Sequence, residues 1–499
     1  MRSNKVAIAT IIHVSDRLLS RVLDFVGALI VARILAPEAF GIVMLGVSAL
    51  TMARGLTEFP VGNALIQKDI VDESDYATAF TLANLRGLLI SLGLCSVAWL
   101  IAKVYNEPIV MPIIYCLAIA PLATGFASPM MAAHLRNINF VPLAIASLAG
   151  KLAGFIATVS IILLTGSFWA LVIGLILSPL VTTIVTYFLA PSPISFSLKH
   201  WKEFFAFSSW MSLAGSVLII YSDGTKFIIG LFVNTAALGI YTVGYSLSQT
   251  VIWSLAGSTI QTFFVGFAQI KNDRERLKKS YLQAQSILVT IFMPIAFGLM
   301  LIAGPLIDIL LGSEWAEAAL VVAWLAPGMA YLVGSSPAQA ISMALNETRA
   351  MFFRNILVVI ISLPLLIVST YYFGLLGAVV ARLIGSIINT FAGFMLVNSL
   401  IGLSVFKQVI AGWRSLIASI TMFLIATFLL RDVFSLFSDS LLQQIVVLAV
   451  YIVVNAIIFI VVLSLLWVLS GRPREAEMMI VKLASQQLGK FKSKIMTKI

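Results

Sequence analysis

Eight basic side chains fall inside stretches of sequence that are otherwise apolar. A cation at the centre of a bilayer costs roughly 2.5 to 3.5 kcal/mol on insertion scales, so such a residue needs an acidic partner, a watery cavity or an anion. The eight are Arg17, Arg21, Arg33, Arg54, Arg86, Lys151, Lys226 and Arg382, and the acidic residues of the same stretches are Asp16, Asp24, Glu58 and Asp223. The apolar stretches therefore carry an excess of positive charge.

Several of these charges have the spacing of neighbours on a helix. Arg17, Arg21 and Asp24 stand at i, i+4 and i+7, so they share one stripe, which we expect to face the protein interior. Two further sets have the spacing of helical ion pairs: Arg54 with Glu58, and Asp223 with Lys226. Such pairs lower the cost of burial, and the sequence leaves open whether they lock helices together or take part in transport.

Three cations have no acidic residue within helical reach, namely Arg86, Lys151 and Arg382. An unpaired cation in the membrane favours a role in binding an anion. Arg33 lies near the end of its apolar stretch, where its side chain can extend to the interface, so we interpret it as an interfacial residue.

The elements that must position these charges are membrane-spanning helices. The 499 residues are 61% hydrophobic and 11% charged, with a mean hydropathy of +1.06, which leaves no room for a large soluble domain. Apolar runs broken by Pro, Gly or charge predict an all-α polytopic membrane protein with fourteen spans. They begin near residues 11, 39, 77, 109, 141, 167, 204, 237, 281, 316, 352, 376, 412 and 441.

The net charge of +11 is explained by topology rather than by nucleic acid. Of the 32 Lys and Arg residues, 22 fall on the side of the two termini, Arg349 and Arg354 among them, and two fall on the opposite side. The excess of basic residues in cytoplasmic loops therefore predicts that both termini are cytoplasmic. The apolar run after Lys5 carries charges and is too long for a cleaved signal peptide.

An internal repeat organises the chain. Residues 30–48 align with residues 228–246 at an offset of 198, with six identical columns that include Gly41 over Gly239, and Asp75 falls over Asp273. Parallel repeats are a known transporter plan. We expect an N-terminal six-helix lobe (1–200), a C-terminal six-helix lobe (201–402), two further membrane helices (403–470) and a basic cytoplasmic tail (471–499).

Catalytic, metal and cofactor chemistry have little support in the sequence. His13, His134 and His200 lie near span ends and are interpreted as interfacial, and Cys95 and Cys116 as core packing. The dense carboxylates Asp72, Glu73 and Asp75 are predicted to be cytoplasmic, and no GxxxxGK[ST] loop for ATP occurs. We therefore expect no catalytic residue, no metal site and no cofactor.

Two stretches resemble a known family. They are Ala32-Arg33-Ile34-Leu35-Ala36-Pro37-Glu38-Ala39-Phe40-Gly41 and Asp223-Gly224-Thr225-Lys226-Phe227-Ile228-Ile229-Gly230, the second followed by Leu238-Gly239-Ile240-Tyr241. They resemble the Wzx-type polysaccharide flippases, which share a superfamily with multidrug (MATE) exporters and the lipid II flippase. Lys226 stands where arginine is more usual in that family, which leaves a point charge in place of a planar fork.

The resemblance implies a MATE-like fold of two V-shaped lobes in a bacterial inner membrane, working by alternating access. It also implies an undecaprenyl-pyrophosphate-linked oligosaccharide as cargo, with membrane lipids and polymerase or export machinery as partners and no nucleic acid. On this interpretation the cations form a cavity that binds the pyrophosphate: Arg17, Arg21, Arg54, Arg86, Lys151, Lys226 and Arg382. Asp24, Glu58 and Asp223 are candidates for ion pairing or coupling.

Two alternatives stay open. A multidrug exporter has the same fold, but a pump for organic cations should favour acidic or aromatic groups in its cavity over the basic excess found here. A membrane glycan polymerase or glycosyltransferase also handles lipid-linked sugars, but such enzymes need a substantial external loop with catalytic groups, and every predicted far-side loop is short.

Overall fold

A computed structural model describes residues 2–57, 65, 68, 71–137, 139–201, 209–429 and 441–471. Within these ranges all regular secondary structure is helical, as the sequence predicts. The predicted basic tail lies outside the described residues, apart from Gly471.

The described helices agree with the predicted spans. Nine helical segments are long and apolar enough to cross a membrane, and two shorter apolar helices, Val110–Gly125 and Trp413–Leu429, accompany them among the described residues. Each of the fourteen expected starts falls within a helix or a few residues before one. The helices are therefore consistent with fourteen crossings.

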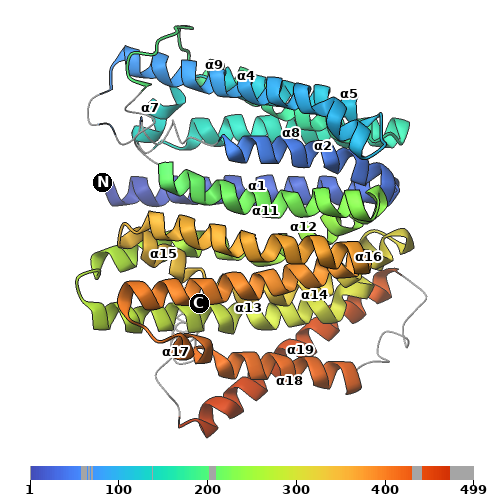
Figure 1. Ribbon diagram of the computed structural model, residues 1–499, viewed down its shortest axis with the longest axis vertical. Coiled ribbons are helices and arrows are strands. Elements are labelled where there is room, and N and C mark those ends of the chain that lie inside the picture. Colours follow the sequence, from blue (N-terminus) through green and yellow to red (C-terminus); the bar gives the residue numbers. More distant parts are fainter. Residues whose placement is uncertain are drawn as a thin grey trace, which may run out of the picture. The chain divides into compact units, whose positions relative to one another are not determined.

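The chain divides into two compact units. Unit 1 comprises Met1–Thr242 and Leu366–Ala378. Its helices are α1 (Arg2–Ile34), α2 (Pro37–Leu56), α4 (Glu73–Val104), α5 (Val110–Leu117), α6 (Ile119–Gly125), α7 (Met131–Arg136), α8 (Val141–Thr165), α9 (Trp169–Leu189), α11 (Ser209–Phe232) and the start of α12 (Thr235–Gln269). The long helices of this unit run side by side, with α8 packed between α1 and α9 (Figure 1).

Unit 2 comprises Val243–Leu365 and Val379–Ile499. It holds the rest of α12, α13 (Arg274–Leu310), the short 3-10 helix η1 (Ser313–Trp315), α14 (Ala316–Gly334), α15 (Pro337–Ala344), most of α16 (Thr348–Ile401), α17 (Val405–Ile410), α18 (Trp413–Leu429) and α19 (Leu441–Leu469). Helix α13 packs against α14, α18 and α19. The predicted lobe boundaries at residues 200 and 402 stay a prediction.

Small residues let the helices of unit 1 pack closely. A Cβ built on Gly150 of α8 would lie 1.9 Å from the hydroxyl oxygen of Thr182 on α9, and one built on Gly174 of α9 would lie 1.9 Å from that of Thr158. Close backbone approach through small residues is how helices associate in lipid, where burial of apolar surface drives little. The α8–α9 pair is therefore held mainly by shape.

Helix α16 is two helices joined at a sharp kink. Gly374 at the kink has φ +58°, a conformation that residues with a Cβ rarely adopt. Beyond it the chain turns back, because Arg354 in the first half bonds to Asn389 in the second half. The two halves correspond to the predicted spans that begin near residues 352 and 376.

The two aligned glycines of the repeat meet in unit 1. A Cβ built on Gly41 of α2 would lie 1.8 Å from the backbone oxygen of Thr235 on α12, and one built on Gly239 would lie 2.1 Å from that of Pro37. Thr235 and Gly239 stand 198 residues after Pro37 and Gly41, so they are the matching positions of the second repeat. The first repeat therefore makes the same contact to the second as the second makes to the first. This reciprocity is typical of an interface on a two-fold axis and supports the repeat.

One column of the predicted repeat is wrong. Asp72 is the N-cap of α4 and accepts a hydrogen bond from the backbone N–H of Asp75, whereas Asp273 is the N-cap of α13 and accepts from that of Arg276. The structural counterpart of Asp273 is therefore Asp72, not Asp75. The connection before the third helix of the second repeat is three residues longer, so the constant offset of 198 does not extend to it.

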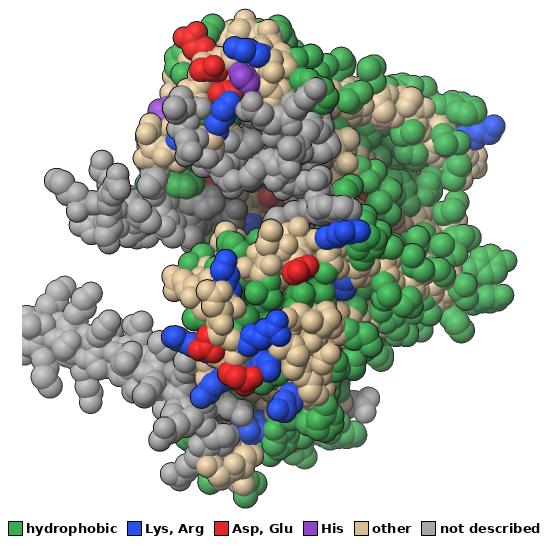
Figure 2. All heavy atoms as spheres, turned by 60° about the vertical axis from the view of Figure 1, so that its left-hand side comes forward, with side chains coloured by type: hydrophobic (Ala, Val, Ile, Leu, Met, Phe, Trp, Pro, Cys, Tyr) green, Lys and Arg blue, Asp and Glu red, His purple; other side chains and the backbone are tan. Residues whose placement is uncertain are grey.

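Apolar side chains cover the flanks of the helices. Many are exposed, among them Leu89 and Trp99 on α4 and Ile457 and Ile460 on α19. In Figure 2 hydrophobic side chains cover the flank of unit 2, whereas its visible charged side chains gather at one end. This is the surface of a multi-pass membrane protein.

Candidate functional site

Helices α1 and α8 bring Asp24 and Lys151 together. The Lys151 Nζ lies 2.6 Å from Asp24 Oδ1 and 2.7 Å from Oδ2. Lys151 has no acidic residue within helical reach in the sequence, but the packing of α1 on α8 supplies one that is 127 residues away. The pair is partly exposed, so it does not belong to the packed core.

Two arginines face each other across α2 and α4. Arg86 Nη2 donates to the backbone oxygen of Arg54 at 3.0 Å, and its Nε donates to the hydroxyl of Thr57 at 3.4 Å. Glu58, the predicted partner of Arg54, lies outside the described residues. The structure thus brings the side chain of Arg86 to the backbone of Arg54, and the predicted pair of Arg54 with Glu58 stays a prediction.

The predicted pair on α11 forms. Lys226 Nζ lies 2.7 Å from Asp223 Oδ1, and both side chains are largely buried, with exposed fractions of 15% and 5%. A buried pair offsets the desolvation of its members only when the geometry is good, and this short contact meets that condition. The i, i+3 spacing thus correctly predicts the ion pair of Asp223 with Lys226.

Helix α2 links the second and third charge groups. It packs against both α4 and α11. Where it meets α11, the Ser216 hydroxyl donates to the backbone oxygen of Gly55 at 2.8 Å, and a Cβ built on Gly55 would meet Ile219 at 2.4 Å. Arg54, next to Gly55, therefore lies close to the point where α2 crosses α11, and Arg86 reaches it from α4.

The stripe predicted on α1 is only partly described. Arg21 and Asp24 lie on the exposed surface of unit 1, and the side chain of Arg17 lies outside the described residues. Asp16 is buried, and among the described residues its Oδ1 has no hydrogen-bond partner.

Arg382, the remaining predicted site residue, lies in unit 2. Its guanidinium carbon stands 5.7 Å from the centroid of the Tyr245 ring, an arrangement that stabilises a cation through the ring face. It is described within its own unit, apart from the charges of unit 1.

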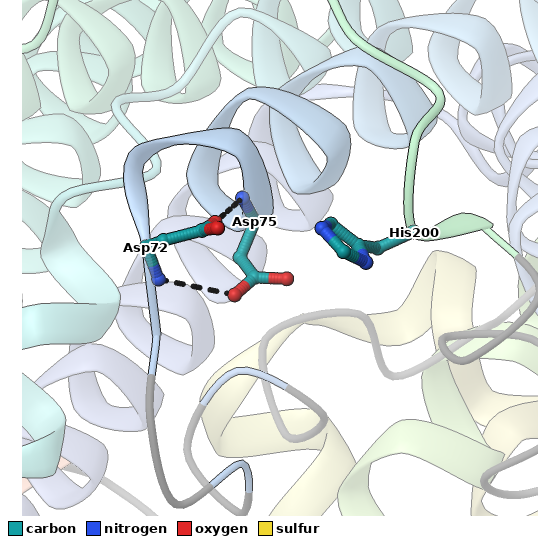
Figure 3. A group of neighbouring side chains, drawn as sticks. All are labelled: Asp72, Asp75 and His200. Carbon is teal, nitrogen blue, oxygen red and sulfur yellow. Dashed lines mark hydrogen bonds between the residues drawn. The ribbon is translucent and has the colours of Figure 1, made fainter.

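The acidic cluster before α4 forms a helix cap. Asp72 Oδ1 accepts from the backbone N–H of Asp75 at 2.8 Å, and Asp75 Oδ2 accepts from that of Asp72 at 3.1 Å, a complete capping box (Figure 3). His200 lies beside them, its Nε2 3.1 Å from the Ser74 hydroxyl, and Lys68 pairs with Asp75 at 2.6 Å. One ligand atom from each of Asp72, Asp75 and His200 lies within 4.8 Å of the others, but the cap accounts for both carboxylates without a metal.

Two further polar residues were not singled out from the sequence. Tyr105, the C-cap of α4, donates from its hydroxyl to the backbone oxygen of Phe227 on α11 at 2.7 Å, next to Lys226. Arg354, counted above with the basic residues of the cytoplasmic side, lies in the second turn of α16 with its Nε buried. The apolar run that follows Arg354 was the only signal of its depth.

The fold is that of known lipid and drug transporters. Structures of the lipid II flippase MurJ in an inward closed conformation (TM-score 0.68, 15% identity, 93% of this chain and 98% of that one) and of an inward-facing multidrug resistance MATE family transporter of the MOP superfamily (0.61, 15%, 77% and 96%) are similar to it. The predicted MATE-like fold is thereby confirmed.

Sequence comparison defines the family. Residues 30–320 match the family described as polysaccharide biosynthesis protein, and the chain belongs to this family. It is 22% identical over 417 residues to the lipopolysaccharide biosynthesis protein WzxC of Escherichia coli, covering 82% of each chain. It is 27% identical over 313 residues to the succinoglycan biosynthesis transport protein ExoT of Rhizobium meliloti, covering 61% of this chain and 62% of that protein.

Proposed function

We propose that this protein is a flippase that carries a lipid-linked oligosaccharide across the membrane for polysaccharide assembly. The cargo we infer is an undecaprenyl-pyrophosphate-linked repeat unit, moved by alternating access from the cytoplasmic to the periplasmic leaflet. The family assignment, the relatives named for polysaccharide biosynthesis and transport, and the flippase-like fold support a transport role over an enzymatic one.

The observation that carries the proposal is the meeting of Arg54 and Arg86. Arg86 reaches the backbone oxygen of Arg54, so two cations lie on neighbouring membrane helices, where a cation favours an anion nearby. A pyrophosphate supplies such an anion, and the planar guanidinium binds phosphate oxygens through two hydrogen bonds at once.

The multidrug exporter is the second candidate, because its fold is shared. A site for an organic cation would gather acidic residues, whereas the described charges on α2 and α4 around this site are arginines. The charge of the site therefore favours an anionic cargo.

The arrangement in the membrane follows from the same proposal. We infer a bacterial inner-membrane location with both termini in the cytoplasm, two lobes formed by residues 1–200 and 201–402, and two further helices within 403–470. Polymerase and export machinery would take the cargo after transfer.

Gene deletion with complementation tests the function. We expect the deletion to abolish surface or secreted polysaccharide and to leave lipid-linked repeat units on the cytoplasmic side. Arg54→Ala and Arg86→Ala should fail to restore polymer at normal protein abundance. Lys103→Ala is the matched control, because Lys103 is on the same helix as Arg86 but lies over the Trp99 ring, 4.9 Å from its centroid. Unchanged polymer together with new sensitivity to cationic drugs would make the protein a multidrug exporter.

A further inference from the structure

Unit 2 holds a half-buried cation, Arg354, most of whose N–H donors have no partner among the described residues. Arg354 Nη2 donates to the side-chain oxygen of Asn389, while its Nε is buried and has no hydrogen-bond partner among the described residues. A guanidinium carries five N–H donors in a fixed fork. One neutral acceptor therefore leaves the group far from satisfied.

No carboxylate is among the partners of Arg354 within the described part of the chain. The hydroxyl of its neighbour Tyr281 donates to Gln408 Oε1 at 3.0 Å. Gln408 in turn donates to the backbone oxygens of Phe394 and Leu403, each at 3.0 Å. This network satisfies its own members and offers Arg354 no negative charge.

The Arg354 guanidinium is held by one hydrogen bond and lies beside a glycine. Asn389 fixes it from the second half of α16, and a Cβ built on Gly393, one turn further on, would lie 3.6 Å from Arg354 Nη1. The arginine itself remains partly exposed. The bond from Arg354 to Asn389 joins the two halves of α16. An uncharged donor could make the same single bond, so this structural role does not explain why a guanidinium stands here.

We propose that Arg354, oriented by Asn389, binds a phosphate group of the lipid-linked cargo in unit 2. This inference rests on the proposed function. A permanent cation with spare planar donors, one neutral amide and no described carboxylate is suited to a phosphate oxygen pair. Arg354 lies near the end of α16 that we infer to face the cytoplasm, so it would meet the cargo on entry.

Binding by the purified full-length protein tests the site. The probe is inorganic pyrophosphate, followed by undecaprenyl pyrophosphate, with the shift of the thermal midpoint and the Kd as readouts. Charge-assisted hydrogen bonds imply that Arg354→Gln weakens pyrophosphate binding by roughly tenfold to a hundredfold. Arg349→Gln is the matched control, since Arg349 lies on the first turn of the same helix, stacked over Phe353 at 5.7 Å. Equal losses in the two variants, or wild-type affinity in Arg354→Gln, would overturn the proposal.

A second variant, Asn389→Asp, tests the same site if Arg354→Gln does not fold. Asn389→Asp places a carboxylate where the guanidinium already binds, so it should raise the thermal midpoint without ligand and remove the stabilisation that pyrophosphate gives. An Asn389→Asp protein still stabilised like the wild type would contradict the site.

The same assays distinguish the source of the phosphate, and they test the Arg354 site separately from the proposed function. Phosphatidylglycerol in nanodiscs that competes with undecaprenyl pyrophosphate at Arg354 would assign the site to bulk lipid and overturn the cargo assignment. If the Arg354→Gln variant exports polymer and binds pyrophosphate like the wild type, the Arg354 site is refuted but the proposed function is not. Polymer that is independent of the gene refutes the proposed function, whatever Arg354 binds.

Discussion

Replacing Gly239 by alanine should disturb the contact between the two repeats in unit 1. The added Cβ would lie 2.1 Å from the backbone oxygen of Pro37, and an oxygen at that distance must move about 0.9 Å merely to reach 3.0 Å. Gly41→Ala is the more severe change, because its Cβ would lie 1.8 Å from the Thr235 oxygen and requires about 1.2 Å. Neither obstacle is a flexible side chain, so the helices themselves must separate.

The cost follows from this displacement. Overpacking a well-packed site costs typically 1 to 3 kcal/mol, and backbone against backbone belongs at the upper end, about 3 kcal/mol. If alternating access breaks this contact in one state, each substitution shifts the population away from the closed-contact state by roughly a hundredfold. Polymer export should then fall sharply while the protein is still made, with Gly41→Ala the more impaired.

The assay compares surface polysaccharide, protein abundance and thermal midpoint. Gly93→Ala and Gly215→Ala are the matched controls, because a Cβ at either position meets nothing within 4 Å and alanine is a better helix former than glycine. Both should keep polymer and stability at or above the wild-type level. A Gly239→Ala protein with wild-type polymer and wild-type thermal midpoint would refute the reasoning.

The ion pairs and the helix cap give three further predictions. The Lys151–Asp24 pair is partly exposed and should contribute only about 0–1 kcal/mol, so Lys151→Ala should leave the thermal midpoint almost unchanged while reducing export. Export restored by the charge exchange Lys151→Asp with Asp24→Lys would show that the pair only holds α1 against α8 and does not bind cargo. Lys226→Ala leaves the Asp223 carboxylate buried alone and should cost about 3 kcal/mol, and adding Asp223→Asn should recover most of the lost thermal midpoint; no recovery would count against the pair. The Ser74 hydroxyl, followed by the Asp75 backbone N–H, holds the pKa of Asp72 below its ordinary value of 3.8. The cap therefore stabilises α4 above that pH and is lost as the pH falls through the lowered pKa, so the thermal midpoint of Asp72→Ala should lie below the wild type at pH 7 and converge with it in strong acid.

Local patterns in the sequence predicted the features that depend on neighbours along the chain. Hydropathy located the helices, because a spanning helix must be apolar over its whole length. The i, i+3 spacing of Asp223 and Lys226 predicted their ion pair, since a helix places such residues on one face.

Features made by distant segments escaped prediction. Lys151 lacks an acid nearby in sequence, and only the packing of α1 on α8 brings Asp24 to it. Arg354 was assigned to the cytoplasmic side because basic residues at span ends are usually topological. Its contact with Asn389 depends on how the two halves of α16 pack, which the predicted spans near residues 352 and 376 do not specify. The sequence therefore identifies the candidate anion-binding residues by their type, but it does not show which distant residues lie next to them.

The reciprocal glycine contact also allows the repeat to be tested by energetics. If Gly41 and Gly239 lie at one two-fold interface, the shift forced by the first alanine makes room for the second, because both Cβ atoms push the same two helix ends apart. The cost of the double variant should then be less than the sum of the single costs by about 0.5 to 3 kcal/mol, the range of coupling between residues in contact. A double-mutant cycle on the thermal midpoint measures this coupling. Additive costs would mean that the two contacts yield independently, so the two-fold arrangement would be an incidental likeness rather than a shared interface.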